Sequence, residues 1–343
     1  MMPSSVKADI TMALSTRVPR LGFLGLGWIG RRRLTSLLAT DACEVAALSD
    51  SSEISLAAAH ALAPDAPMAS TLDALLAHDL DGLVIATPSG LHADQCLAAL
   101  PRGVAVFCQK PLARTADETR RVLAAARTAD RLLGIDYSYR HVAAFSHAAA
   151  LVQSGVLGDL YAVDLTFHNA YGPDKGWCKD HALSGGGCLI DLGVHLIDFA
   201  LLALANPSID AVTAHRWSQG RPSRRASQDV EDFATGQFTT SSGITVRLAC
   251  SWWSHIGQGA SIEAQFHGTR GGVRVANVHG SFFDFVCERL QGDRSEVLIQ
   301  PPDDWEGRAL AAWTAQLTRS PRYDPAVESS LVVADVLDRM YAA

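Results

Sequence analysis

The stretch VFCQKPLA places a rare side chain where it could do chemistry. The chain contains four lysines, and Lys110 is the one that follows a short apolar run and precedes a proline. An ammonium group at the end of a buried strand can orient an oxygen atom and stabilise negative charge on it, and it can titrate, which a guanidinium does not. The alternative interpretation is a solvated surface charge.

A second group of polar residues recurs at helical spacing in GGGCLIDLGVHLID. Asp191, His195 and Asp198 would share one face of a helix on which nearly all neighbours are apolar. Two carboxylates and an imidazole in a buried stripe cost free energy unless they line a site. The histidine therefore predicts proton transfer near neutral pH. A core histidine held by the two aspartates is the alternative.

Metal binding is a further interpretation of the same region. Cys178, His181, Asp191 and His195 are all ligand types, although their spacing matches no strong zinc pattern. The seven cysteines include no CxxC pair, which favours reduced thiols in a cytoplasmic protein. We therefore expect a site without a metal.

The segment LGFLGLGWIGRRRL has the spacing of a dinucleotide-binding turn. Gly25, Gly27 and Gly30 follow an apolar run and open a helical pattern. In this setting they permit a tight turn, a close approach of the backbone to a pyrophosphate, and close packing of helix on strand. The N–H groups at the helix start, around Trp28 and Ile29, would attract the phosphates. An ordinary turn between strand and helix is the alternative.

Asp50 ends the next apolar run, EVAALSD, at the distance expected of the ribose-binding acid. A carboxylate there accepts hydrogen bonds from both ribose hydroxyls and repels a 2′-phosphate, which favours NAD over NADP. A helix N-terminal role is the alternative for Asp50. Arg31, Arg32 and Arg33 are expected in a solvated first helical turn, where Arg31 could supplement phosphate binding.

Two strand patterns must position these groups. From residue 21 to about 139 short, continuously apolar runs alternate with helical periodicity, which predicts a doubly wound parallel sheet covered on both faces. After about residue 140 the runs alternate apolar and polar residues, which predicts a mainly antiparallel sheet with one open face. The expected strands are 21–25, 44–50, 82–88, 104–108, 132–138, 232–240, 244–253, 261–268, 272–277 and 281–286, and the expected closing helices are 305–317 and 327–342.

Composition limits the partners. The 343 residues are 48% apolar and 19% charged, which is ordinary for a globular protein of two domains. A net charge of −7 argues against nucleic acid or an anionic membrane as a partner. The most apolar long segment, LIDLGVHLIDFALLALA, contains two aspartates and a histidine, so we interpret it as a core helix and not as a membrane span.

Four motifs in order, GLGWIG, ATPSGLH, CQKP and GGGCLIDLGVHLID, resemble the Gfo/Idh/MocA family of glucose-fructose oxidoreductase and inositol dehydrogenase. The resemblance covers nearly the whole chain from Leu21. It implies a Rossmann domain over 21–140 after a flexible tail at 1–20, and a second α/β domain over 141–343 with an open antiparallel sheet and final helices that pack back on the first domain. It also implies NAD(P)-dependent chemistry on a sugar or polyol, and a homodimer or homotetramer. The segment 218–229 is the expected flexible loop.

The resemblance also assigns cofactor contacts. Thr87, Pro88 and His92 match the loop that runs beside the nicotinamide ribose, with a helix-start role as the alternative for His92. Gln109 and Lys110 match the family's Glu-Lys-Pro motif. Gln109 replaces its glutamate, which removes one negative charge beside Lys110 and keeps an amide that can hydrogen-bond.

The catalytic hypothesis combines both constellations. Oxidation of a carbinol requires a base near neutrality and a positive group where alkoxide charge develops. His195 would accept the proton, Lys110 would orient and stabilise the reacting oxygen, and Asp191 would hold a substrate hydroxyl or bias the imidazole. The expected substrate contacts, for which domain-interface packing is the alternative, are Arg140, Asn169, Tyr171, Trp177, Asp191 and His195.

Three functions fit these features. The first is an NAD-dependent dehydrogenase or reductase of a sugar, polyol or related compound. The second is an NAD-using glycosidase that shows no net redox change, and the third is a non-catalytic NAD-binding regulator. Trp252 and Trp253, adjacent on an expected strand, should point to opposite faces, one into the core and the other toward an oligomer contact.

Overall fold

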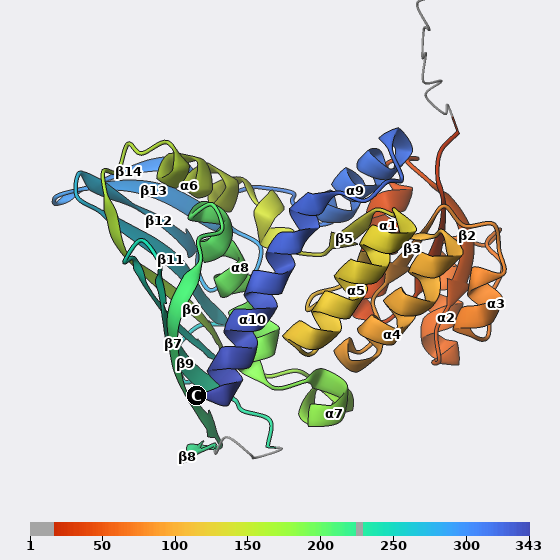
Figure 1. The fold of residues 1–343 in the computed structure, drawn as a ribbon, viewed down its shortest axis with the longest axis horizontal. Helices are drawn as coiled ribbons and strands as arrows, with labels where there is room; N and C mark the ends of the chain where they lie inside the picture. The colour runs from red at the N-terminus through yellow and green to blue at the C-terminus, as the bar shows by residue number, and fades with distance from the viewer. Residues whose placement is uncertain (1–16, 224–228) are drawn as a thin grey trace, which may run out of the picture.

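The structure is a computed structural model that describes residues 17–223 and 229–343. Most of the predicted tail and the central part of the predicted loop at 218–229 lie outside the described residues. Two sheets side by side organise the described chain (Figure 1).

The first sheet is parallel throughout and has the order β2-β1-β3-β4-β5. This order confirms the predicted doubly wound sheet, and its strands coincide with the five continuous apolar runs because both faces are covered. The strands are β1 (Arg20–Leu24), β2 (Glu44–Ser49), β3 (Gly82–Ile85), β4 (Ala105–Cys108) and β5 (Leu133–Ile135), and the helices are α1 (Trp28–Leu38), α2 (Glu53–His60), α3 (Leu72–Leu76), α4 (Ser89–Ala99) and α5 (Ala116–Ala129).

The second sheet has nine strands in the order β14-β13-β12-β11-β6-β10-β9-β7-β8. All strand pairs are antiparallel except β6 with β10. This pairing confirms the prediction of a mainly antiparallel sheet. The strands are β6 (Leu160–Asn169), β7 (Ile209–Ser218), β8 (Arg221–Pro222), β9 (Phe233–Thr240), β10 (Thr245–Ser251), β11 (Ala260–Gly268), β12 (Gly271–Asn277), β13 (Phe285–Gln291) and β14 (Arg294–Ile299).

Two features of this sheet differ from the prediction. The expected strand at 281–286 is a turn up to residue 284, because Ser281 Oγ accepts hydrogen bonds from the backbone N–H groups of Phe283 and Asp284, and β13 begins only at Phe285. Four strands, β6, β7, β8 and β14, were not predicted, although the buried alternate residues of β6 form the centre of the sheet.

Helices cover one face of this sheet and leave the other face open (Figure 1). The covering helices are α6 (Ala143–Gln153), α8 (Val194–Ala203) and α10 (Ser329–Ala342). The segment His181–Ala203 is, within the described ranges, the one helical stretch long and apolar enough to cross a membrane, but 83% of its most apolar part is buried inside the protein. It packs as a core helix.

The C-terminal helices connect the two sheets. Helix α9 (Arg308–Arg319) packs on the parallel sheet, where the Trp313 ring lies 5.6 Å from the Phe107 ring. Helix α10 then contacts α5, α8 and β7, so it lies between the two sheets (Figure 1). The half with the parallel sheet therefore depends on residues from the far end of the chain.

Candidate active site

The turn between β1 and α1 has the geometry of a dinucleotide site. Gly25 has a φ of +85°, and a Cβ there would lie 2.6 Å from the backbone of Ala86 and Thr87. A Cβ on Gly30 would lie 2.0 Å from the Gly25 oxygen, whereas a Cβ on Gly27 would meet nothing within 4 Å. Gly27 begins α1 without a side-chain cap. Open space over uncapped helix N–H groups fits a pyrophosphate, so the residues present fit the cofactor.

Asp50 stands beside this turn. Its Oδ2 accepts a hydrogen bond from the Leu26 N–H at 2.5 Å and its Oδ1 accepts one from the Ser52 N–H at 2.7 Å. These two contacts fix the carboxylate between the ends of β1 and β2, at the edge of the parallel sheet where nucleotides bind in such folds.

The three arginines have separate partners. Arg31 donates to the Leu26 carbonyl oxygen at 2.8 Å, and Arg32 pairs with Glu306 while its guanidinium lies 5.1 Å from the Trp28 ring. Arg33 is buried, so the prediction of a solvated turn is wrong at this residue. Arg33 points toward the sheet because it lies three residues after Gly30 in the helical period. The buried carboxylate of Asp136 neutralises its charge there.

Lys110 lies at the end of β4 and reaches across to the second domain. Its Nζ donates to Asp191 Oδ1 at 2.7 Å and to the Asp191 carbonyl oxygen at 2.8 Å. Trp252 Nε1 donates to Asp191 Oδ2 at 3.2 Å. The Lys110 side chain is 15% exposed and that of Asp191 is 41% exposed. The pair is therefore oriented but open to a ligand, and the solvated-charge interpretation of Lys110 is wrong.

His195 lies next to this pair. Burial, together with the positive charges of Lys110 and Arg33, holds the pKa of His195 well below its usual range. The ring packs on Tyr139, with 4.9 Å between ring centroids, and has no hydrogen-bond partner among the described residues. A neutral imidazole without an internal partner can accept a proton from a ligand.

Asp198, the third polar residue on the predicted helix face, pairs with an arginine. Asp198 is buried and forms a two-point ion pair with Arg140, with Nε to Oδ2 at 3.0 Å and Nη2 to Oδ1 at 2.5 Å. Residues Leu189–Gly193 form a π-helical turn before α8, which breaks the regular spacing between Asp191 and His195, whereas His195 and Asp198 both lie within α8. Arg140, a predicted substrate contact, is thus paired with this helix.

The start of the helical segment that carries Asp191 and His195 is anchored by a buried acid that the sequence did not reveal. Glu231 Oε1 accepts hydrogen bonds from the N–H groups of Gly187 and Leu189 and from the Tyr341 hydroxyl, at 2.9, 3.0 and 2.7 Å. A Cβ on Gly187 would lie 1.9 Å from the backbone carbonyl oxygen of Glu231. This close approach explains why GGGC has a glycine at position 187. It also fixes the start of the π-helical turn that carries Asp191.

His92 lies behind the site with no exposed surface. Its Nδ1 and Nε2 each lie 2.8 Å from a carbonyl oxygen, of Pro111 and Thr87 respectively. Burial lowers the pKa of His92, and the two carbonyls oppose that change. The structure thus gives this histidine a positioning role in place of the predicted cofactor contact, because it ties the loop after β3 to the loop that carries Lys110. Pro88 is the N-cap of α4.

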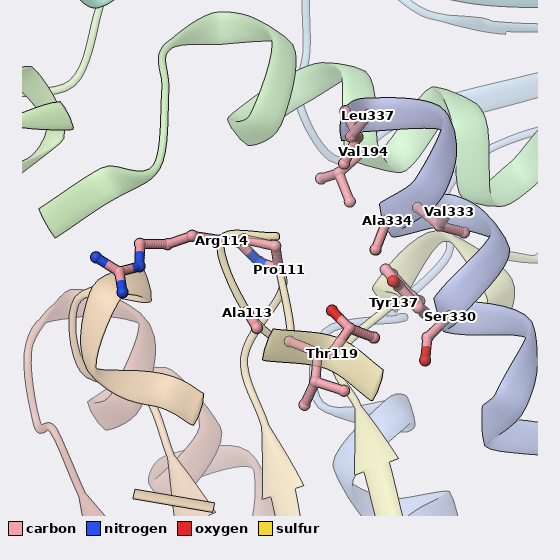
Figure 2. Close-up of a pocket in the computed structure, with 11 residues that line it drawn as sticks. Pro111, Ala113, Arg114, Thr119, Tyr137, Val194, Ser330, Val333, Ala334 and Leu337 are labelled. Carbon is pink, nitrogen blue, oxygen red and sulfur yellow. The ribbon is translucent and has the colours of Figure 1, made fainter. Parts of the chain in front are cut away.

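The loop after Lys110 is packed on both sides. Residues 111–114 meet Tyr137, Val194 and helix α10 around a cavity of about 10 Å³, room for about one water molecule (Figure 2). Figure 2 shows Ser330, Val333 and Leu337 along α10 facing this loop. The second domain therefore packs against the loop that follows Lys110.

The predicted substrate contacts lie on the strand end and loop before the catalytic helix. Asn169 ends β6, and its Oδ1 is buried without a partner among the described residues. Tyr171 is 55% exposed, and Trp177 lies in the short turn Gly176–Lys179. Trp252 is buried and Trp253 is exposed, as predicted, although both follow the end of β10.

The alternative metal site is not assembled. Within residues 17–223 and 229–343, no three histidine, cysteine, aspartate or glutamate side chains are placed to hold one ion. The set of Cys178, His181, Asp191 and His195 is thus not a ligand cluster.

Comparisons with known proteins agree with this geometry. Residues 19–137 match the oxidoreductase family with an NAD-binding Rossmann fold, and residues 145–274 match the GFO/IDH/MocA C-terminal domain. The chain is 28% identical over 282 residues to D-glucoside 3-dehydrogenase of Escherichia coli K12, covering 78% of this chain and 80% of that protein.

Two solved structures share the fold. GenD2 from gentamicin A biosynthesis, in complex with NAD, aligns with a TM-score of 0.77 at 22% identity over 99% of this chain and 96% of its own. KijD10, a 3-ketoreductase from Actinomadura kijaniata in complex with NADP and TDP-benzene, aligns with a TM-score of 0.80 at 23% identity over 94% and 96%. With both domains matched in order, the chain belongs to the Gfo/Idh/MocA family of NAD(P)-dependent oxidoreductases, which act on CH–OH groups.

Proposed function

We propose that this protein transfers a hydride between NAD and a hydroxyl-bearing or carbonyl carbon of a sugar, polyol or glycoside. The observation that carries the proposal is the contact of Lys110 Nζ with Asp191 Oδ1 at 2.7 Å, beside a histidine whose pKa is well below its usual range. A relative whose name is D-glucoside 3-dehydrogenase supports a sugar ring as the substrate.

The chemistry divides among three side chains. The nicotinamide, when bound, supplies the acceptor for the hydride that leaves the carbinol carbon. Lys110 donates a hydrogen bond to the reacting oxygen and stabilises its developing negative charge. His195 takes the hydroxyl proton in oxidation and returns it in reduction. Asp191 holds the ammonium group, and its exposed carboxylate can accept a hydrogen bond from a neighbouring sugar hydroxyl.

Asp50 supports NAD as the cofactor. Its carboxylate is fixed beside the phosphate-binding turn by the Leu26 and Ser52 N–H groups. A negative charge there favours two ribose hydroxyls over a 2′-phosphate. Asp50→Ser should therefore weaken NAD binding and reduce the preference for NAD over NADP.

The substrate is expected to lie against the loop before the catalytic helix. Tyr171 and Trp177 offer ring faces to a sugar, and Asn169 has an acceptor atom without a partner among the described residues. Arg140 is engaged by Asp198, so we assign it to the support of the helix and not to the substrate.

The open face of the nine-stranded sheet supports self-association. No helix covers this face in the described chain (Figure 1), and Asp164, Arg247 and Gln237 line a hollow of about 640 Å³ on it. We propose a homodimer or homotetramer, which light scattering would report as a multiple of 36.6 kDa.

The deciding experiment is a panel of glucosides, free sugars, inositols and nucleotide sugars assayed with NAD and NADP in parallel at 340 nm. Stoichiometric NADH from a free hydroxyl compound supports the proposal. Glycoside cleavage without net NADH would favour the glycosidase, and no turnover across the whole panel would favour a regulator. A preference for NADP would contradict the role of Asp50.

A further inference from the structure

Behind Lys110 lies a buried network that the catalytic hypothesis does not use. Asp136 follows β5, and its side chain is 0% exposed. Its Oδ2 accepts hydrogen bonds from Arg33 Nε at 2.5 Å and from Gln109 Nε2 at 2.9 Å. Its Oδ1 is buried and has no hydrogen-bond partner among the described residues. A buried carboxylate in this position depends on those two donors.

Gln109 connects this network to the catalytic loop. Its side-chain Oε1 accepts a hydrogen bond from the backbone N–H of Lys110 at 3.0 Å. Its backbone N–H donates to the Ile85 carbonyl oxygen at 2.8 Å. The amide is thus an acceptor toward Lys110 and a donor toward Asp136. A glutamate at this position could accept from Lys110, but it would place a second carboxylate against Asp136, and the two would have to share a proton.

We propose that Arg33, Asp136 and Gln109 form one positioning unit for Lys110, in which Asp136, directly after β5, carries the negative charge. Arg33 neutralises this charge, and the Gln109 amide transmits its position to the backbone of Lys110. The Asp136 carboxylate is therefore satisfied by an uncharged donor at position 109. This inference rests on the proposed function only for its kinetic readout.

The test is an exchange of the two side-chain types. Gln109→Glu brings two carboxylates together, Asp136→Asn leaves Arg33 without its counter-charge, and the double variant restores one carboxylate and one amide in reversed order. In the double variant only one carboxylate remains, so no proton has to be shared, and the new carboxylate at position 109 supplies the counter-charge that Arg33 loses. Gln291→Glu, at the exposed end of β13, is the matched control.

We expect Gln109→Glu to lower kcat for sugar oxidation about tenfold to 100-fold with a smaller change in KM, an effect typical of a displaced catalytic group. The double variant should recover to within about fivefold of the wild type. Gln291→Glu should match the wild type. Recovery in the double variant, when each single variant is impaired, is a result that a merely structural role does not produce.

Thermal unfolding of the protein without cofactor gives an independent readout. In Gln109→Glu the shared proton raises the pKa of the new carboxyl, so the folded state loses stability relative to the wild type as pH rises from about 4 toward 8. The wild type and the double variant should lack this extra pH dependence.

Two results would overturn the inference. One is a Gln109→Glu protein with wild-type kcat and no added pH dependence of unfolding. The other is a folded double variant that is no better than the worse single variant. If no sugar is oxidised by the wild type, the proposed function fails, while the unfolding series still decides the positioning unit.

Discussion

At the scale of single residues, chemistry depends on how burial and charge divide the roles of Lys110 and His195. Lys110 is kept oriented by Asp191, whereas His195 has no internal partner among the described residues and is surrounded by Tyr139 and positive charge. A positive group and a neutral base side by side are what alkoxide formation requires. The same arrangement makes proton donation by His195 in reduction harder at neutral pH.

The depressed pKa of His195 predicts a pH profile. A free histidine titrates near pH 6.5, and burial with the charges of Lys110 and Arg33 places this one well below that value. The kcat/KM for oxidation should therefore keep its full value down to about pH 6.5 and fall only below it. The free energy of unfolding should also fall as the pH drops below about 6.5. At those pH values the unfolded chain binds a proton that the buried ring does not.

The profile is measured as initial NADH formation between pH 5 and 9. His215→Asn, at an exposed position on the open sheet, should leave the acidic limb unchanged. An acidic limb centred at pH 7 or above would show that His195 is not the base or is not neutral.

At the scale of elements, the turn after β1 separates packing from binding. Gly30→Ala would press a Cβ against the Gly25 oxygen, whereas Gly27→Ala would enter open space. We expect Gly30→Ala to lower both the melting temperature and NAD affinity, since overpacking costs about 1–3 kcal/mol. Gly27→Ala should weaken NAD at least about tenfold while the cofactor-free protein melts within about 2 °C of the wild type.

Calorimetry and NAD titration of the two variants check this difference. If Gly27→Ala binds NAD as the wild type does, the phosphates do not approach that residue, and the assignment of the turn fails.

Sequence patterns predicted the elements better than the contacts between them. Continuous apolar runs gave all five parallel strands, because burial on both faces leaves a strong local signal. The π-turn at Leu189–Gly193 leaves no such signal, so the shared face of Asp191, His195 and Asp198 was predicted from a regular period that the chain does not keep. The pairing of Arg33 with Asp136 joins residues 103 positions apart, and no local pattern reveals it.

The sequence predicted those parts of the candidate site whose motifs lie next to the ends of strands or helices. Lys110 and Asp191 meet because each ends or begins an element at the junction of the two sheets. Arg140 and His92 were assigned to ligands by position in the motif, whereas the structure pairs Arg140 with Asp198 and buries His92 completely. Glu231 was missed because a single acid outside any motif is indistinguishable by sequence from a surface residue.

At the scale of the whole molecule, the C-terminal helices hold the two halves together. Trp313 on α9 is 4% exposed and packs on Phe107 and against Gly82 and Gly134 of the parallel sheet. Trp313→Ala should cost about 3–5 kcal/mol of unfolding free energy, as expected for a large buried ring. Because α9 leads into α10, which covers the catalytic loop, NAD binding should weaken as well.

Denaturant unfolding with NAD titration measures both effects. Trp253→Ala, at a 45% exposed position, is the matched control and should change stability by about 1 kcal/mol or less. Equal losses in the two variants would mean that α9 does not contribute to the core of the nucleotide-binding half.

The central claim is that the junction of the two halves carries out proton and hydride transfer with His195 as the base. His195→Asn tests it most directly, measured as NADH formation at 340 nm with the best sugar of the panel and as NAD affinity by fluorescence titration. The account predicts that kcat for oxidation falls at least about 100-fold, while the Kd for NAD stays within about threefold. Turnover within about tenfold of the wild type, or a loss of NAD affinity equal to the loss of turnover, would contradict it.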